Sequence, residues 1–373
     1  MKRKLSILIL ALVTVICCAF GLAACDDIIA NIGNGGSGSN TEQGGGNGSD
    51  TNTEQGGSNN GGNTNTEQGT VGLEYALSGY GKDKYYMFCG IGNCTDTEIV
   101  IPDFYKGKPV KTICDGAFNE CSGLTSVTIG NNVTEISYGV FNKCSGLESI
   151  TVGSGNTVYH SAGNCLIETQ SKILIAGFKN SVIPTDGSVT TIGGNAFYSC
   201  EGLASIAIPN SVTTIGREAF GNCNGLTSVT IPDSVTEIGR EAFENCSGLT
   251  SVTIGNGVTA IDEDVFAWCS GLTSITIGNS VTEISFGAFR GCDVLEDVSL
   301  PTIAIEYIPK NNLKTVIITS GNEIGDYAFD GCTRLKSVTI PDSIISISYR
   351  AINRERDTRK TPKITQKSLQ MIV

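Results

Sequence analysis

The sequence predicts an α/β solenoid, in which one short structural unit is stacked many times instead of a single globule being folded. A cysteine returns every 23 residues through much of the chain, and each interval repeats the same order of apolar and polar residues. A fixed period of this length is typical of stacked repeats, each of which buries its apolar surface only against its neighbours. The regularly spaced cysteines are Cys121, Cys144, Cys200, Cys223, Cys246, Cys269 and Cys292.

The residues from Leu226 to Cys246 show what each unit contains. The stretch LTSVTI alternates β-branched apolar residues with threonine, which predicts a short strand with one buried face. SVTEIG then forms a second extended run. In REAFENC the residues Ala242, Phe243 and Cys246 are spaced for one face of a helix, which predicts one or two helical turns.

Strand motifs of the LxxVxI type recur through residues 73–352, which we take as the repeat domain. We expect the first strands of all units to form one parallel sheet. Its outward positions carry mostly hydroxyl side chains, which suit a β-strand and could also contact a protein or a glycan. The expected strands start at Thr97, Leu124, Leu147, Leu203, Leu226, Leu249, Leu272, Leu295, Leu313 and Leu335, and the outward positions are Thr128, Thr151, Thr230, Thr253, Thr276, Ser299, Ile317 and Thr339.

The repeated pattern CxxLxxVxIPxSVTxIGxxAFxxC resembles the BspA-like, or Treponema-type, leucine-rich repeat of surface lipoproteins, over roughly residues 95–352. The resemblance implies a curved, right-handed leucine-rich-repeat solenoid with a parallel sheet on one face and short helical turns on the other. It also implies a role on the cell surface in attachment to proteins or to other cells.

The recurring cysteines are interpreted as a column of small buried side chains. Zinc sites use cysteines two to four residues apart, whereas these are 23 apart. We expect the layers on the helical side to be spread beyond the spacing of about 4.4–6.8 Å between Cα atoms that a disulfide needs. Cys89 and Cys94, in CGIGNC, lie outside the column, and a disulfide between them is an alternative to two reduced thiols.

Two segments precede the repeats. Residues 1–24 have a basic start and an apolar run, which predicts a secretory signal peptide. The sequence LAAC ends at Cys25 and resembles a bacterial lipobox, so we expect lipidation of Cys25 and attachment to the extracytoplasmic side of a bacterial membrane. An uncleaved membrane-spanning helix is the alternative. Residues 25–72 are rich in Gly, Asn and Thr and repeat TEQG, which predicts a disordered tether.

The period breaks in three places. Near residues 153–190, which include the only histidine, His160, the stretch NCLIETQSKILIAG predicts a β-hairpin insertion. Between Cys292 and Cys332 two strand motifs share one interval, which predicts a unit that lacks its helical half. Residues 353–373 form an irregular tail with six basic and two acidic residues. A binding tail is one interpretation, but the loss of the repeat pattern favours a truncated or frame-shifted end.

Several function classes are disfavoured. With a single histidine and no GxSxG motif, no candidate nucleophile has an adjacent base, so we predict neither catalysis nor a catalytic residue. The glycine runs lack the lysine of a phosphate-binding loop, and we expect no cofactor and no metal. A net charge of −12 opposes binding to nucleic acid. The acidic residues Asp262, Glu263 and Asp264 are expected at a helix start, where they suit the helix dipole.

Aromatic residues at positions where sibling units carry polar residues are the candidate partner-binding residues, because Trp and Tyr are favoured anchors of protein interfaces. Cover for a neighbouring unit is the alternative for each of them. The predicted function is adhesion to a host, matrix or neighbouring-cell protein, and a non-enzymatic glycan-capturing or structural surface component is the alternative. The candidates are Trp268, where Asn222 and Asn245 stand, Tyr198, where Gly221 and Glu244 stand, and Tyr138 and Phe286, where Arg217 and Arg240 stand.

Overall fold

The computed structural model describes residues 69–348, 350–351 and 363–365. The predicted signal peptide, the lipidation of Cys25 and most of the tether lie outside the described residues. The boundary between tether and repeats differs from the expected one, because Thr70 already exchanges hydrogen bonds of 3.1 and 2.8 Å with the backbone of Val100.

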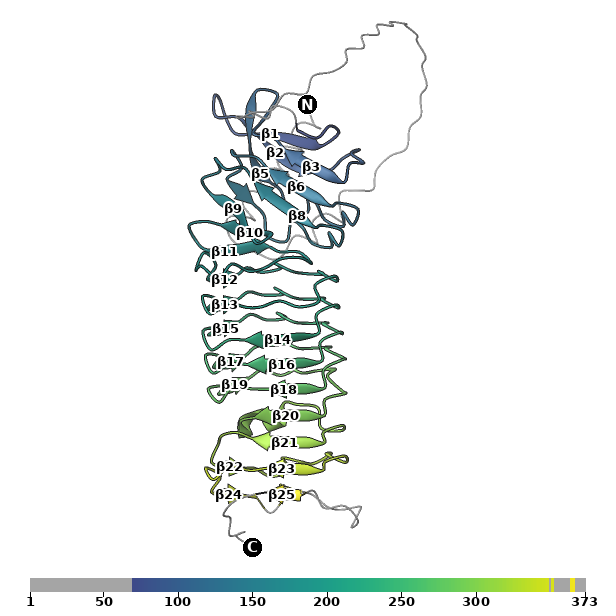
Figure 1. Ribbon diagram of the computed structural model, residues 1–373, viewed down its shortest axis with the longest axis vertical. Helices are drawn as coiled ribbons and strands as arrows, with labels where there is room; N and C mark the ends of the chain where they lie inside the picture. Colours follow the sequence, from purple (N-terminus) through teal and green to yellow (C-terminus); the bar gives the residue numbers. More distant parts are fainter. Residues whose placement is uncertain (1–68, 349, 352–362, 366–373) are drawn as a thin grey trace, which may run out of the picture. The chain divides into compact units, whose positions relative to one another are not determined.

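The first strands of successive units pair in parallel and in register. Val229 pairs with Val252, and Thr230 pairs with Thr253, so identical positions of neighbouring units meet. Valine and isoleucine are buried while threonine faces out, because successive side chains of a strand point to opposite faces. The strands of this seven-stranded sheet, stacked in one column in Figure 1, are β14 (Ser228–Ile231), β16 (Ser251–Ile254), β18 (Ser274–Thr276), β20 (Asp297–Leu300), β21 (Thr315–Ile318), β23 (Ser337–Thr339) and β25 (Lys363–Thr365).

A second column contains strands of only two residues. In each of them an isoleucine enters the core while its neighbour faces outward or is half-buried, as Ile238 and Glu237 show. Four neighbouring pairs of these strands are parallel and hydrogen-bonded, so units are joined through this column as well as through the first. They are β12 (Thr191–Ile192), β13 (Thr214–Ile215), β15 (Glu237–Ile238), β17 (Ala260–Ile261), β19 (Glu283–Ile284), β22 (Glu323–Ile324) and β24 (Ser346–Ile347).

The predicted helical turns are wrong. The described residues contain no α-helix, and residues 239–246 form a succession of tight turns instead. Glu241 and Asn245 adopt left-handed backbone angles, with φ of 62° and 58°, which an α-helix does not accommodate. Some N–H groups bond within the turns, whereas others donate to the next unit, as Phe243 does to the Val265 carbonyl at 2.9 Å. Apolar residues three and four apart still point inward, so their spacing alone does not distinguish these turns from a helix.

The N-terminal section, residues 73–152, contains less regular copies of the same unit. β1 and β2 are antiparallel, and β2 then pairs in parallel with β5. β3, β6 and β8 form a separate three-stranded parallel sheet. The strands are β1 (Glu74–Ser78), β2 (Tyr85–Gly90), β3 (Glu98–Ile101), β4 (Phe104–Tyr105), β5 (Lys108–Ile113), β6 (Ser126–Ile129), β7 (Glu135–Ile136) and β8 (Ser149–Val152).

The predicted hairpin is present and divides the first column of strands. β10 (Cys165–Glu168) pairs antiparallel with both β9 (Tyr159–Ala162) and β11 (Ile173–Ala176), and β11 continues in parallel into β12. The expectation of one continuous sheet is therefore wrong. The strand expected from Leu203 does not form at residues 204–208, because the hairpin replaces the preceding unit and leaves this segment without a parallel partner on that side.

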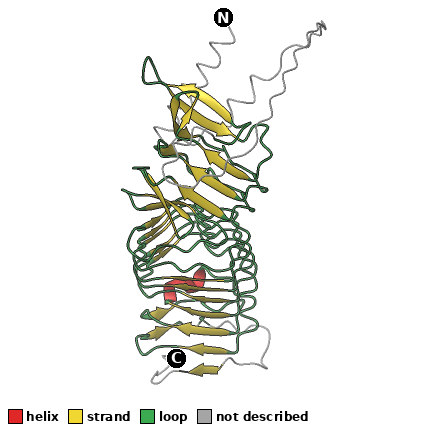
Figure 2. Ribbon diagram, turned by 45° about the horizontal axis from the view of Figure 1, so that its top comes forward, coloured by secondary structure: helices red, strands yellow, loops and turns green. Residues whose placement is uncertain are grey.

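The other two breaks also have a structure. β20 and β21 are the two strand motifs expected between Cys292 and Cys332, and the short 3-10 helix η1 (Thr302–Glu306) connects them. Figure 2 shows this helix in red among strands and loops. The tail is not irregular throughout, because Lys363–Thr365 forms β25 and continues the sheet in register with β23. The interpretation that the repeat pattern is lost after residue 352 is wrong for these three residues.

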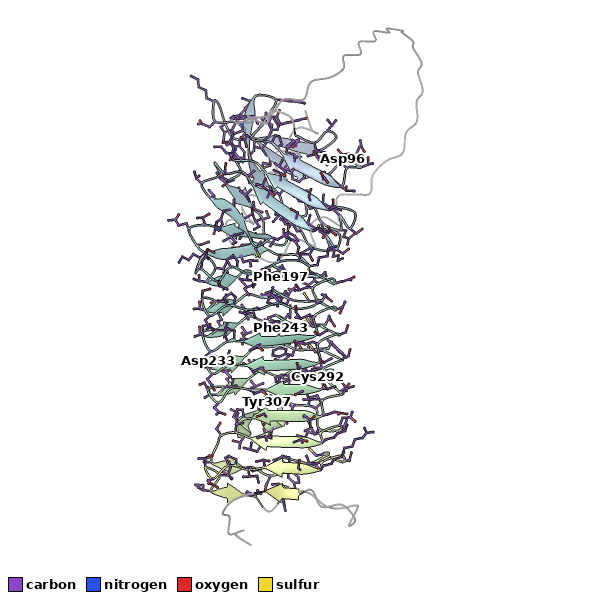
Figure 3. All side chains as sticks on the ribbon, viewed as in Figure 1. Asp96, Phe197, Asp233, Phe243, Cys292 and Tyr307 are labelled. Atoms are coloured by element: carbon purple, nitrogen blue, oxygen red, sulfur yellow. The ribbon has the colours of Figure 1, made fainter. Side chains whose placement is uncertain are left out.

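Stacked phenylalanines form the centre of the core. In neighbouring units their ring centroids are 5.0 to 5.6 Å apart, and their planes differ by 4° to 10°. Parallel stacking does not continue through the hairpin. There, Phe178 meets Phe141 of the N-terminal section edge-on, with the ring centroids 5.7 Å apart. The buried residues accordingly form two clusters that meet at the hairpin. The stacked residues, two of which are labelled in Figure 3, are Phe197, Phe220, Phe243, Phe266 and Phe289.

Candidate functional site

The turn segments that lead to each recurring cysteine form one continuous surface along the units, which we call the turn face. Each segment holds two left-handed residues four positions apart, such as Asp264 and Trp268 with φ of 57° and 60°. Asparagine and glycine tolerate this conformation, but a tryptophan adopts it at an energetic cost. Asn222 and Asn245 occupy the position of Trp268 in the two preceding units. Trp268 is therefore a departure from the residue type that the backbone favours.

Trp268 combines exposure with specific contacts to the next unit. Its indole lies over Gly291, where an added Cβ atom would approach the ring to 2.5 Å. The guanidinium carbon of Arg290 is 5.5 Å from the ring centroid, a cation–π arrangement. Even so, 48% of the tryptophan surface is exposed. Trp268 thus covers its neighbour, as the alternative interpretation holds, and it also presents about half of its surface to solvent.

Arg290 links Trp268 to Asp264, and Phe286 belongs to the same unit as Arg290. One of its terminal nitrogens lies 3.2 Å from the Asp264 carboxylate. Phe286, four residues before Arg290, is 89% exposed. We call Asp264, Trp268, Phe286 and Arg290 the Trp268 cluster. The explanation of Asp264 as an acid at a helix start is wrong, since no helix forms there and the carboxylate pairs with Arg290.

Phe286 ends a column of charged residues. Arg217 forms 3.0 Å ion pairs with Glu218 and Glu241, and Arg240 is paired with Glu241 and Glu263. Phe286 follows Glu263 at the same position of the next unit. These exposed ion pairs contribute little to stability. From Glu263 to Phe286 the exposed side chain at this position changes from charged to aromatic between one unit and the next.

Tyr138 and Tyr198 are not part of this cluster. Tyr138 is 58% exposed and belongs to the N-terminal section. Tyr198 is half-buried and packs over Gly221, where an added Cβ atom would meet its ring at 3.0 Å. Tyr198 also lines a shallow notch beside the hairpin, together with Asn142 and Asn195. The four candidate residues are therefore distributed over separate places, and only Trp268 and Phe286 come from adjacent units.

The outer face of the long sheet carries the expected row of hydroxyl side chains. Thr253 pairs with Thr230 on one side and Thr276 on the other, and all three side chains are exposed. Ile317 interrupts the row as an apolar side chain that is 41% exposed. The row repeats the same kind of side chain from unit to unit and is nearly uncharged. The Trp268 cluster differs, because its residues depart from those of the sibling units.

Five of the recurring cysteines are core residues, as predicted, whereas Cys121 and Cys200 are only partly buried at its margin. The thiol of Cys246 donates to the Phe220 carbonyl at 3.1 Å, and three further cysteines of the regular units make the same bond at 3.1 to 3.2 Å. Burial raises the pKa of Cys144 to about 12 and that of Cys165 to about 11. The expected wide spacing of the layers is wrong, because neighbouring turns are hydrogen-bonded to each other.

Cys89 and Cys94 are both reduced, and Cys89 has a different neighbour from the one considered in the sequence. Its Sγ lies 3.6 Å from Sγ of Cys114, whereas Cys94 accepts a hydrogen bond from the Asp96 N–H. His160 on β9 bonds to the Thr169 hydroxyl at 2.8 Å. Within the described ranges no three His, Cys, Asp or Glu residues gather as metal ligands do, and no helix has the length and hydropathy to cross a membrane.

Arg290 and Cys114 are the residues that the sequence interpretation missed. Arg290 stands where sibling units have Gly221 and Glu244, so the comparison of units that singled out Trp268 could also have found it. Cys114 gave no such signal, since its proximity to Cys89 depends on the pairing of two strands distant in sequence.

The chain resembles known leucine-rich repeat proteins in sequence and in structure. The model of the BspA type leucine rich repeat region matches residues 84–173, 190–313 and 305–367 in six copies. A leucine-rich repeat protein from Eubacterium ventriosum has 24% identity and a TM-score of 0.51, over 74% of this chain and 67% of that one. A leucine-rich cell surface protein from Faecalibacterium prausnitzii has 26% identity and a TM-score of 0.35, over 75% and 90%. No curated protein sequence matches the chain.

Proposed function

Because the chain belongs to the BspA-type leucine-rich repeat family, we propose that it is a non-enzymatic binding protein whose target is another protein on a host cell, a matrix or a neighbouring cell. We place it on the outer side of a bacterial membrane, with a lipid on Cys25 as its anchor. The LAAC sequence that ends at Cys25 supports the anchor. The family resemblance supports the surface role.

The Trp268 cluster is the observation that carries the choice of a protein target. It combines a half-exposed tryptophan, a fully projecting phenylalanine and an arginine held between an aromatic ring and a carboxylate. Tryptophan and arginine dominate the binding energy of protein interfaces. The left-handed backbone at Trp268 adds weight, since a bulky residue in a strained conformation is a feature of functional sites.

The row of exposed threonines supports the second candidate, capture of a glycan. Its hydroxyl groups repeat along the sheet at about the 4.8 Å spacing of parallel strands, and they can donate and accept hydrogen bonds. This row is on the strand side of each unit, whereas Trp268 is on the turn face. Substitutions on each surface therefore separate the two candidates.

The test measures binding of the purified protein to immobilised panels of matrix proteins, cell-surface proteins and glycans. A Trp268→Asn and Phe286→Arg double variant gives the cluster the residues of sibling units. We expect saturable binding to at least one protein, weakened by the double variant by about tenfold or more, which is about 1.4 kcal/mol. The matched control is Tyr80→Ala, which removes another strongly exposed aromatic side chain from the loop between β1 and β2. We expect the control to bind as the unaltered protein does.

Binding to glycans alone, lost on Thr253→Lys and retained in the double variant, would replace the protein target with glycan capture. The anchor is tested separately in cells fed a palmitate analogue. We expect the label on the unaltered protein and its loss in Cys25→Ala, and labelling that persists in the variant would contradict lipidation at this residue.

A further inference from the structure

Cys89 on β2 and Cys114, the residue directly after β5, lie side by side in the N-terminal section. β2 and β5 are parallel, with Phe88 opposite Ile113, and the Cys114 N–H donates to the Phe88 carbonyl at 3.0 Å. The next residues along both strands are the two cysteines, so they occupy facing positions. Parallel strands lie about 4.8 Å apart, which is within the range of Cα separations found in disulfides.

The two sulfur atoms are already close. Sγ of Cys89 and Sγ of Cys114 are 3.6 Å apart, and both residues are partly exposed to solvent. A rotation of the two side chains is sufficient to bring the sulfurs to bonding distance, because the facing backbone positions are already suitable. An oxidant can also approach them, which is not so for the fully buried thiols of the regular units.

The chemical environment of this pair is opposite to that of the core cysteines. The hydrogen bond from Cys114 lowers the pKa of Cys89 to about 7, although burial and the Glu74 carboxylate act in the other direction. Burial raises the pKa of Cys144 to about 12. The thiolate is the reactive form, so Cys89 is the nucleophile and the core thiols are inert at neutral pH.

We propose that Cys89 and Cys114 are a redox site that closes into a disulfide between β2 and β5. The Cys89 thiolate attacks one sulfur of an incoming disulfide, supplied by a low-molecular-weight disulfide or a thiol oxidoreductase, and displaces one thiolate from it. The Cys114 thiolate then attacks the Cys89 sulfur of this mixed disulfide and displaces the second one. The two cysteines together lose two protons and two electrons, and the incoming disulfide is reduced to two thiols.

Other cysteines nearby are less suitable partners. Cys94 has its sulfur engaged by the Asp96 N–H at 3.4 Å, in the turn after β2. The Cys121 thiol is directed to the Asn119 carbonyl at 3.7 Å. The closed link joins the antiparallel β1–β2 pair to the first parallel strand that follows it. The disulfide therefore fixes the first described strands of the repeat stack, and outside the cytoplasm it persists.

The test is disulfide mapping of the full chain in detergent after equilibration with oxidised glutathione and blocking of the remaining thiols. Trypsin releases Cys89 on residues 85–106 and Cys114 on residues 112–143. We expect these two peptides joined by a disulfide, with loss of the link in both Cys89→Ser and Cys114→Ser. The link should remain in Cys94→Ser and Cys121→Ser, the matched controls that remove the other cysteine of each peptide.

Absence of the link at every ratio of oxidised to reduced glutathione would overturn the proposal, and so would a bond from Cys89 to Cys94 in the unaltered protein. A second measurement does not depend on the folding of variants. In the reduced, unaltered protein at pH 7, we expect Cys89 to react with iodoacetamide at least about tenfold faster than Cys144. Equal rates at the two cysteines would also contradict the proposal.

Discussion

The regular stack, residues 189–300, and the N-terminal section, residues 73–152, derive from the same repeat but stabilise it differently. In the regular stack neighbouring phenylalanine rings lie within 10° of parallel, and four of the recurring thiols donate to a phenylalanine carbonyl, as Cys144 also does in the N-terminal section. In the N-terminal section Phe88 and Phe118 are tilted by 34°, and three tyrosines pack together at the edge. The three tyrosines are Tyr75, Tyr86 and Tyr105.

The difference teaches that repetition of sequence gives repetition of contacts only where a unit has a neighbour on both sides. An interior unit can be nearly identical to the next one, because each supplies what the other lacks. A unit at the end of the stack, or beside the hairpin, has one face without such a neighbour. Among the described residues, the tyrosine group and the Cys89–Cys114 pair are contacts of the first units and have no counterpart in the regular stack.

Substitution of one stacked phenylalanine is the strongest way to probe this comparison. Phe243 is fully buried between Phe220 and Phe266. We expect Phe243→Ala to lower the free energy of unfolding by about 3–5 kcal/mol, because it leaves a cavity that neighbours hydrogen-bonded on both sides cannot close. Urea denaturation measures this loss. A loss below about 1 kcal/mol would mean that the units slide together to fill the cavity.

Phe141→Ala is the matched variant at the margin of the N-terminal section. Phe141 stacks on Phe118 on one side but meets Phe178 edge-on at the hairpin. We expect a loss about 1 kcal/mol smaller than for Phe243→Ala, since one parallel contact is missing and the site is slightly exposed. Equal losses in the two variants would show that the hairpin supports the stack as well as a regular unit does.

The features that depend on the period could be predicted from the sequence. The repeat of 23 residues places each valine and isoleucine of the first strand inside and each threonine outside, and it places cysteine in the core. The register of the long sheet follows, because identical positions must meet. Those predictions needed only the alternation of strand side chains and the period itself.

The rest depended on contacts that the period does not encode. A helix and a series of turns both bury residues such as Ala242, Phe243 and Cys246, and the left-handed angles of Glu241 and Asn245 separate them. The Trp268 cluster needs the position of Arg290 in the next unit. In both cases the decisive interaction lies between neighbouring units and is visible only when they are stacked.

Alkaline pH should lower the free energy of unfolding, because the buried thiols are stable only in their protonated form. The expected effect is smaller than that of losing a phenylalanine. Burial raises the pKa of Cys144 to about 12 and of Cys165 to about 11, from an ordinary value of 9.0. Their contribution is fully present below pH 9 and is lost as the pH rises, because the unfolded chain ionises first. By pH 10 we expect a loss of about 1 kcal/mol for each thiol, measured as a shift of the urea midpoint relative to pH 8.

Cys89 should show the opposite pH dependence, which sharpens the comparison. Its pKa is about 7 in the folded protein, below the ordinary value. Its contribution is therefore present above pH 9 and is lost as the pH falls through 7. A Cys114→Ala variant removes the side-chain hydrogen-bond donor beside Cys89, so it should lose this part of the pH dependence and retain the alkaline loss of the core thiols. An alkaline loss that also disappears in this variant would contradict the assignment to the core.

Exchange of residues at one left-handed position has the smallest expected effect on stability. Trp268 and Asn245 share this position in adjacent units, and both N–H groups donate to the next unit. Trp268→Asn relieves the strain of a bulky left-handed residue and loses the cation–π contact, so we expect a change within about 1 kcal/mol. Asn245→Trp introduces the strain without Arg290, since Ala267 stands there, and should lower stability by about 1 kcal/mol. Equal and large losses in both variants would mean that Trp268 is needed for folding, whereas the expected asymmetry leaves recognition as the reason for its presence.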